Sequence, residues 1–297
     1  MVAFRCEEPV ELELDIPEPQ MVLLSNFFPD EFVEVQLSAT QSILTTGEYT
    51  PIEGATVRLL IGDETVEVLQ QVEGRDGQLP YYTTLDFQPR AGVRYTIHAN
   101  ASGYVPVSAV SSIPEPVPIT SFQQLSSHLD SQEDGSSLFH LSFELDYEDP
   151  EIFDDYYHLK LLQEVEELKI VPNVGDTVVI NRRLEPILFP FNNQENSWIP
   201  AILRSGGGVL IKNKPFDPLL ELNVTQEFVN LERPGRLFVE LRVVSDDYYN
   251  FQSSLSRQRQ NGNLPTVDAV EISNNVTNGQ GVFAGYNFVR DTLQVNF

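Results

Sequence analysis

Cysteine is almost absent from this chain: it occurs once in 297 residues, at position 6. A single cysteine excludes a disulfide within the chain, so no covalent cross-link can stabilise the fold. A chain of this length can bury enough apolar surface to fold without one. The core is therefore expected to rest on packing and hydrogen bonding.

Basic residues are scarce as well. Lysine and arginine number 18 against 44 aspartates and glutamates, which gives a formal net charge of −26. A surface this negative repels phosphate backbones and excludes nucleic acid as a partner. It also disfavours direct docking on anionic lipid head groups, so the folded body is expected to stand off any membrane.

Long apolar runs are missing too. The longest span only a few residues, whereas a transmembrane helix needs about 20, so any membrane attachment is expected to be covalent. The four histidines lack a second ligand at zinc-site spacing, and the sequence contains no nucleophile elbow or zinc-protease motif. We expect a non-enzymatic protein with no catalytic residues and no metal.

The lone cysteine opens an acidic N-terminal segment. Glu7 and Glu8 follow Cys6, and six carboxylates lie between Glu7 and Glu18. Such a segment stays extended and solvated, so the thiol is exposed unless it is modified. Residues 1–5 are similar to the end of a secretion signal, and Cys6 is therefore predicted to carry a covalent lipid, the only added group expected. The alternative is a cysteine that the fold buries as a small apolar residue.

Alternating apolar and polar residues dominate the rest of the chain. Val33, Val35 and Leu37 alternate with glutamate and glutamine. The same period of two recurs in five other segments: residues 57–61, 95–99, 139–145, 237–243 and 293–297. Strands at this spacing, separated by glycine, proline and asparagine, predict antiparallel sheets packed as sandwiches. The predicted fold class is therefore mainly all-β.

Three prolines within five residues mark a domain boundary in the stretch Ile113–Ile119. Prolines cannot donate to a strand ladder, and they favour a stiff, extended connector. The sequence thus predicts a lipid-anchored acidic tether at residues 1–20 and an immunoglobulin-like β-sandwich at residues 21–117. A larger β-sandwich domain with one or two helices is predicted at residues 118–297.

One helix is predicted after Ser245. Ser245 suits its N-cap, Asp246 and Asp247 suit its first turn, and Gly262 suits the position past its end. An apolar stripe at helical spacing runs along it: Tyr248, Phe251 and Leu255.

Two other segments are less clear. Residues 156–168 fit a helical face or an alternating strand. The polar residues 126–137 predict an exposed loop.

Three segments carry a family resemblance: the proline-rich connector, the tyrosine-rich helix at residues 245–255, and Ser273–Tyr286. The third reads S-N-N-V-T-N-G-Q-G-V-F-A-G-Y and is the most specific. Together they resemble a Bacteroidota family catalogued as domain of unknown function 4249, over residues 21–289. The chain departs from the family's S-N-I-x-G-G-x-G-x-F-x-G pattern at Thr277–Gly279, where a tighter glycine pair is expected.

The resemblance implies an outer-membrane lipoprotein encoded beside TonB-dependent receptors. The implied partner is a TonB-dependent outer-membrane β-barrel receptor, which this protein would serve as an accessory or substrate-capture subunit. Glu7 and Glu8 match an export signal of surface lipoproteins, so the implied location is the cell surface, anchored through Cys6. The family has no assigned reaction. A stand-alone glycan- or peptide-binding adhesion lipoprotein is the alternative.

Two loops are candidates for contact with a ligand or partner. Asn274, Asn275, Phe283 and Tyr286 combine amide and aromatic side chains that can hold sugars or peptides; a glycine-rich loop threading back into the sheet is the structural alternative. Trp198 lies in a polar loop and is the second candidate, because exposed aromatic residues often anchor interfaces. A tryptophan folded over the edge of its own sandwich is equally compatible with the sequence.

An acidic run at residues 144–155 holds seven carboxylates in twelve residues. Calcium takes six to eight oxygen ligands, so Asp146, Glu148, Asp149 and Asp154 form a weak calcium candidate. The spacing matches no defined calcium loop, which favours a solvated turn. Because glycosidases need only two carboxylates at the right separation, a hydrolase stays open as a third interpretation.

Overall fold

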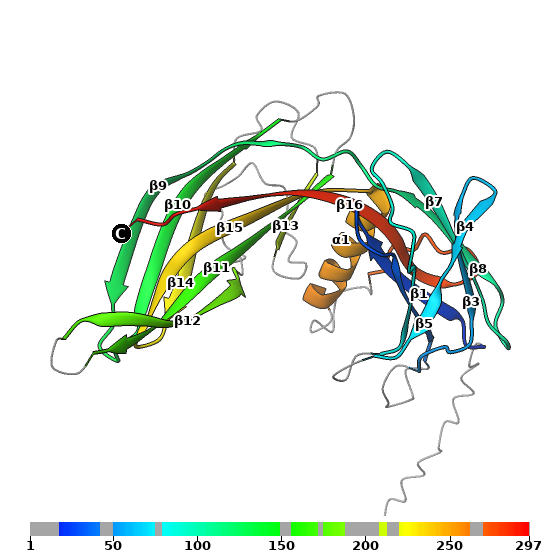
Figure 1. The fold of residues 1–297 in the computed structure, drawn as a ribbon, viewed down its shortest axis with the longest axis horizontal. Coiled ribbons are helices and arrows are strands. Elements are labelled where there is room, and N and C mark those ends of the chain that lie inside the picture. Colours follow the sequence, from blue (N-terminus) through cyan, green and yellow to red (C-terminus); the bar gives the residue numbers. More distant parts are fainter. Residues whose placement is uncertain are drawn as a thin grey trace, which may run out of the picture.

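The chain forms two β-sandwiches joined in an arch, with one helix beneath it (Figure 1). The computed structural model describes residues 18–41, 50–74, 79–148, 156–171, 175–187, 208–212, 220–261 and 270–296. Strands predominate, and the described residues contain one helix. The predicted fold class, mainly β and of the sandwich type, is therefore confirmed.

The largest sheet has nine strands and runs through both sandwiches. They are β1 (Met21–Phe27), β2 (Glu34–Ala39), β5 (Gln70–Val72), β6 (Tyr81–Thr83), β11 (Tyr156–Ile170), β12 (Thr177–Pro186), β13 (Gly208–Lys212), β15 (Glu232–Val244) and β16 (Gln280–Leu293). Their order is β12-β11-β15-β16-β1-β2-β6-β5, with β13 also pairing with β11.

Two smaller sheets complete the sandwiches. The first has the order β4-β3-β7-β8 and comprises β3 (Thr56–Ile61), β4 (Glu64–Val68), β7 (Arg94–Asn100) and β8 (Val107–Ser112). The second has the order β14-β10-β9 and comprises β9 (Ile119–Ser131), β10 (Ser137–Tyr147) and β14 (Leu220–Phe228).

Each sandwich has its own hydrophobic core, built from the inward-facing alternate residues of its strands. The first core holds Val57 and Ile97 together with Phe283, which comes from the other end of the chain. The second core includes Phe143 of β10 and Leu159 of β11.

Strand β16 belongs to both sandwiches. Its first part pairs parallel with β1, from Val22↔Gln280 to Phe27↔Gly285. Its second part pairs antiparallel with β15, from Val244↔Tyr286 to Leu237↔Leu293. The predicted division at residue 117 stays a prediction, but the strand pairing shows that residues 280–285 complete the N-terminal sheet.

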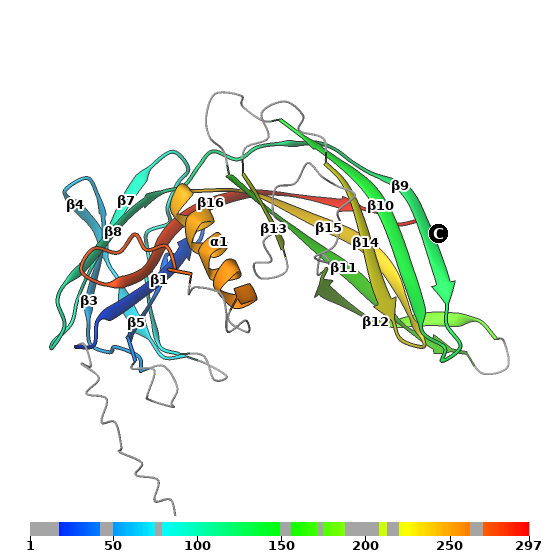
Figure 2. The same ribbon diagram turned by 180° about the vertical axis from the view of Figure 1, so that it is seen from behind.

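The predicted helix is confirmed as α1 (Asp246–Asn261). The Ser245 hydroxyl accepts a hydrogen bond from the Tyr248 backbone N–H at 3.3 Å, as an N-cap does. Figure 2 shows α1 from behind, lying against the nine-stranded sheet in the angle between the two sandwiches. We call the side of the sheet that carries α1 the concave face.

The two less clear segments are a strand and the end of a strand with the turn that follows it. Residues 156–168 belong to β11, in which Tyr157, Leu159 and Leu161 alternate into the second core. The loop prediction for residues 126–137 was wrong for residues 126–131, which extend β9, but it is confirmed for the turn at residues 132–136. These residues are polar because most of this edge strand is exposed.

The glycine at position 281 lets β16 and β1 approach closely. Its φ is +119°, and a Cβ there would lie 2.0 Å from the Leu23 carbonyl oxygen. Backbone atoms cannot move aside as a flexible side chain does. We predict that Gly281→Ala lowers the free energy of unfolding by at least about 3 kcal/mol, measured by urea denaturation.

Gly103→Ala is the matched control, since Gly103 also has a positive φ of +86° but no atom within 4 Å of an added Cβ. Only backbone strain applies there, about 1 kcal/mol. Equal losses in the two variants would contradict a steric role for Gly281.

Candidate functional site

Several residues singled out in the sequence lie outside the described residues. These are Cys6, Glu7, Glu8, Asp149, Asp154 and Trp198. Asp146 is the last outward-facing residue of β10, and Glu148, just after the strand, is exposed. In the described part of the chain, no group of three or more His, Cys, Asp or Glu side chains is placed to hold a metal.

The asparagines of the predicted contact loop hold the chain in place. Asn275 donates from Nδ2 to the Phe283 carbonyl at 2.8 Å and accepts from the Phe283 N–H at 3.0 Å. Asn274 donates to the Gly279 carbonyl at 2.9 Å and accepts from the Val276 N–H, also at 2.9 Å. Both amides thus bind backbone within their own segment, which is the structural alternative weighed from the sequence.

The two aromatic residues of this segment point to opposite faces of the sheet. Phe283 is fully buried in the first core and stacks on Phe27 with ring centroids 4.3 Å apart. It therefore offers no surface to a ligand. Tyr286 lies on the concave face beside α1, with the Arg242 guanidinium 4.4 Å from its ring centroid. Burial raises the pKa of Tyr286 to about 12, so its hydroxyl stays neutral.

A chain of charged and polar groups runs across the concave face from α1. Nδ1 of His158 lies 2.9 Å from the Tyr248 hydroxyl, which accepts a hydrogen bond from Arg242 at 3.2 Å. Arg242 and Arg290 each bind a different oxygen of Glu240, at 2.6 and 2.7 Å. Glu240 is only 6% exposed, and the two guanidiniums compensate for the burial of its charge.

Electrostatics on this face keep Glu240 ionised. Burial alone would raise the pKa of the Glu240 carboxyl, but Arg242 and Arg290 together hold it below its ordinary value. Lys160 stands directly across from Glu240 on β11. Burial, with Arg242 nearby, lowers the pKa of the Lys160 ammonium.

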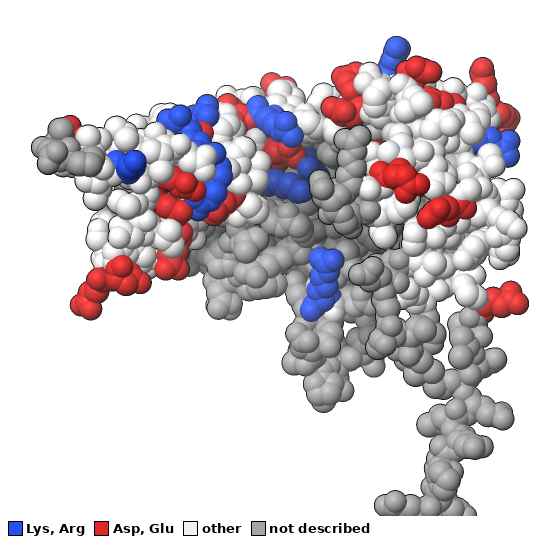
Figure 3. All heavy atoms as spheres, turned by 60° about the horizontal axis from the view of Figure 1, so that its bottom comes forward, with Lys and Arg blue, Asp and Glu red and all other residues white. Residues whose placement is uncertain are grey.

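Basic side chains gather on this face of the second sandwich. Cross-strand pairing places Lys160, Glu240 and Arg290 in one row, and Arg182, Glu166 and Arg233 in another. Viewed from the underside of the arch, Lys and Arg cluster over the second sandwich, while the first shows mostly Asp and Glu (Figure 3). The sequence carries the same asymmetry, because 28 of the 44 acidic residues but only five of the 18 basic ones precede residue 156.

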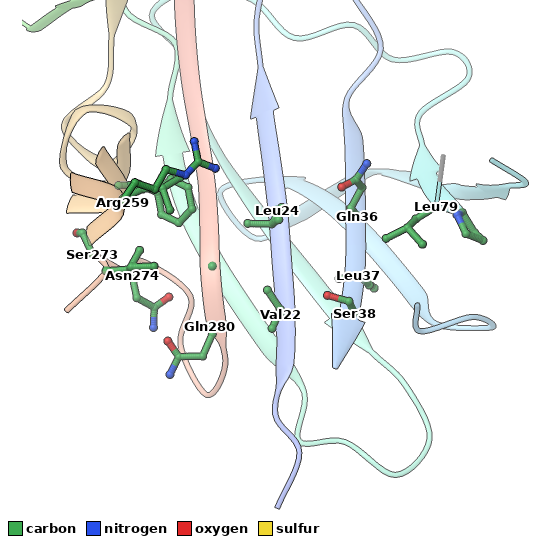
Figure 4. Close-up of a pocket in the computed structure, with 15 residues that line it drawn as sticks. Val22, Leu24, Gln36, Leu37, Ser38, Leu79, Arg259, Ser273, Asn274 and Gln280 are labelled. Atoms are coloured by element: carbon green, nitrogen blue, oxygen red, sulfur yellow. The ribbon is translucent and has the colours of Figure 1, made fainter. Parts of the chain in front are cut away.

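An apolar groove lies on the same face, between α1 and the outward side of β1. Its volume is about 440 Å³, and its walls include Leu24, Phe251, Leu255 and Ile272. Figure 4 shows Val22 and Leu24 of β1 on the groove floor, with Arg259 and Asn274 on one side and Gln36 and Leu79 on the other. Among the predicted contact residues that the structure describes, Asn274 is the one that borders the groove.

Comparison with known families matches residues 7–292 to the family described as Domain of unknown function (DUF4249). The chain belongs to this family. This confirms the family that the sequence resembled, whereas its bacterial source and its lipid anchor stay predictions. No curated protein matches the chain. No helix in the described ranges is long and apolar enough to cross a membrane.

Reasoning from the sequence missed the charged residues of the concave face. Lys160, Glu164 and Glu166 occupy the same side of β11, and the alternation of residues 156–166 carried that signal once the segment was read as a strand. Arg182 comes from the next strand along the chain, β12, which pairs with β11 as a hairpin. The partners on β15 and β16 depend on strand pairing between distant segments, which the sequence did not reveal.

We predict that Asn275→Ala lowers the free energy of unfolding by about 2–3 kcal/mol, because it leaves the Phe283 N–H and carbonyl without their partner. Urea denaturation measures this. The exposed Asn230, in the turn before β15, provides the control: Asn230→Ala is expected to cost less than about 0.5 kcal/mol. A loss below about 1 kcal/mol for Asn275→Ala would show that its amide does not hold β16.

A second prediction concerns Glu240 and pH. A carboxyl whose pKa is lowered by folding stabilises the fold above its unfolded pKa, and the effect is lost as pH falls through the folded pKa. Glu240→Gln is therefore expected to cost about 3 kcal/mol at pH 7. The difference in the free energy of unfolding between this variant and the unmodified chain should shrink as the pH falls below 4.5, the ordinary pKa of the carboxyl.

Urea midpoints at pH 7 and pH 3.5 test this, with the exposed Glu227→Gln on β14 as control. A difference that is the same at both pH values would mean that the ion pairs of Glu240 do not stabilise the fold.

Proposed function

We propose that this protein is a non-enzymatic lipoprotein of the outer membrane that captures a ligand for a TonB-dependent transporter. Its concave face is the binding face in this proposal. The observation that carries it is the gathering of basic side chains on this one face of a chain with a net charge of −26. A positively charged patch on an acidic protein attracts anionic partners, whereas the rest of the acidic surface repels them.

The construction of the arch supports a binding role. Two sandwiches share β16, and their connector is bound to it, because Asn287 donates to the Pro114 carbonyl at 3.1 Å. Such a frame holds the concave face in one shape, which lowers the entropic cost of binding.

The N-terminal sequence supports the location. Cys6 followed by Glu7 and Glu8 fits a lipid anchor with a surface-export signal. The acidic segment that follows would separate the folded body from the membrane. The transporter as partner comes from the family resemblance.

The apolar groove favours a second candidate, a stand-alone protein that binds glycans or peptides. A groove of about 440 Å³ with apolar walls and amide groups at its rim is within the size range of small-ligand sites. In this case the protein would bind its ligand without a transporter.

Isolation from native outer membranes distinguishes the two. We predict that the full chain, extracted in mild detergent, brings a β-barrel transporter with it in near-stoichiometric amount, as measured by mass spectrometry. Cys6→Ser is the matched variant, and it should leave the outer-membrane fraction because it lacks the lipid. Recovery of the full chain without any barrel would contradict the proposed partnership and favour the stand-alone candidate.

A further inference from the structure

A β-bulge in β15 brings two arginines to the same face. Val165 pairs with Pro234 and Gln163 with Leu237, so Gly235 and Arg236 together oppose the single residue Glu164. In a regular strand, residues three apart point to opposite faces. The extra residue of the bulge shifts the alternation of side chains by one, so Arg233 and Arg236 both lie on the concave face.

A buried glutamine on β11 stabilises the bulge. Gln163 is fully buried, and its Nε2 donates to the carbonyls of Gly235 and Arg236, each at 3.2 Å. Glu164 packs closely against this glycine: a Cβ at position 235 would lie 2.6 Å from Glu164 Oε2, so the carboxylate would have to shift from its place. Gln163 and Gly235 are thus the residues that support the bulge.

Two buried carboxylates position three arginines around the bulge. Glu166 accepts from Arg182 Nε at 2.9 Å on one oxygen and from Arg233 Nε at 2.8 Å on the other. Glu164 binds Arg236 through Nη2 at 2.8 Å and through Nε at 3.2 Å. The Glu side chains are at most 10% exposed, whereas the three arginines are about half exposed.

The three guanidiniums keep unused donors. Both Glu166 oxygens are taken through Nε atoms, and no hydrogen bond among the described residues uses the terminal nitrogens of Arg182 or Arg233. These side chains line an open cavity of about 500 Å³, together with Pro234 and Gln294. Both carboxyl pKa values are lowered: that of Glu164 by Arg236, and that of Glu166, against its burial, by Arg233 and Arg182.

We infer that this arginine cup, formed by Arg182, Arg233 and Arg236 over Glu164 and Glu166, binds a carboxylate group of the captured ligand. Three guanidiniums against two carboxylates leave one positive charge, which a single carboxylate balances. Guanidinium forks bind planar carboxylates through paired hydrogen bonds. A surface ion-pair network needs neither a bulge nor a buried glutamine to hold its arginines in place.

This inference deepens the proposed function by naming the chemistry of the ligand, and it rests on that function only for the ligand's origin. The test uses the purified full chain without membrane or transporter. Loss of carboxylate binding and loss of transporter association are therefore separate results.

Isothermal titration with succinate and with a triglutamate peptide tests the cup at low ionic strength. We expect both to bind, or triglutamate alone if the natural source is an acidic peptide. The double variant Arg182→Gln/Arg233→Gln should weaken binding at least about tenfold, since hydrogen bonds to charged groups are among the strongest in proteins. Arg182→Lys keeps the charge but loses the fork, so an intermediate loss is expected.

Arg183→Gln is the matched control. Arg183 neighbours Arg182 on β12, but it points to the opposite face, where it binds Glu167, Glu185 and Glu232. Binding should be unchanged in this variant.

Circular dichroism checks that the double variant is folded. If it is not, the single Arg182→Gln on the edge strand, which leaves Glu166 paired with Arg233, takes its place. If neither succinate nor triglutamate binds, or if Arg183→Gln weakens binding as much as the cup variants do, the inference is overturned. Binding of inorganic phosphate but of neither acid would overturn its assignment to carboxylates.

Discussion

The pairing of β16 with both β1 and β15 is the constraint on which the rest of this structure depends. The first half of β16 pairs with β1 and the second half with β15, and backbone of the first sandwich lies close against the first half. Gly281 and Gly285 allow this close approach, since a Cβ at either position would strike backbone of β1 or β8. The asparagines before them fix where the strand begins. The asparagines and glycines of Ser273–Tyr286 are thus explained by strand pairing.

The same strand creates the concave face. Beyond the first core, three residues of β16 lie on this face. Tyr286 and Phe288 belong to the cluster beside α1, and Arg290 lies opposite Glu240 in the second sandwich. Arginines there are held by an aromatic ring and a buried carboxylate, as Arg290 is by Phe288 and Glu240, and Arg236 by Phe238 and Glu164. Charges fixed in this way cost less entropy to bind than free surface side chains. The face combines a rigid frame, a positive field and an apolar groove.

Local pattern was enough to predict the strands and the helix. Period-two alternation marked β2, β7, β10 and β15, and Ser245 with its two aspartates marked the start of α1. The candidate site was harder to predict, because it depends on pairing between distant segments. Phe283 sits among asparagines and glycines typical of a surface loop, yet Phe27 buries it from the far end of the chain. The bulge at Gly235 likewise has meaning only opposite Gln163 and Glu164.

The central claim is that the shared strand fixes the two sandwiches as one body with one concave face. Pulsed electron–electron double resonance tests this claim most directly. The spin labels are attached at two exposed sites, on β4 through Glu64→Cys and on β9 through Leu125→Cys. The chain also carries Cys6→Ser, so that the native cysteine is not labelled. We predict one narrow distance distribution, unchanged when triglutamate is added. A broad or two-peaked distribution would show that the sandwiches move against each other and would contradict the account.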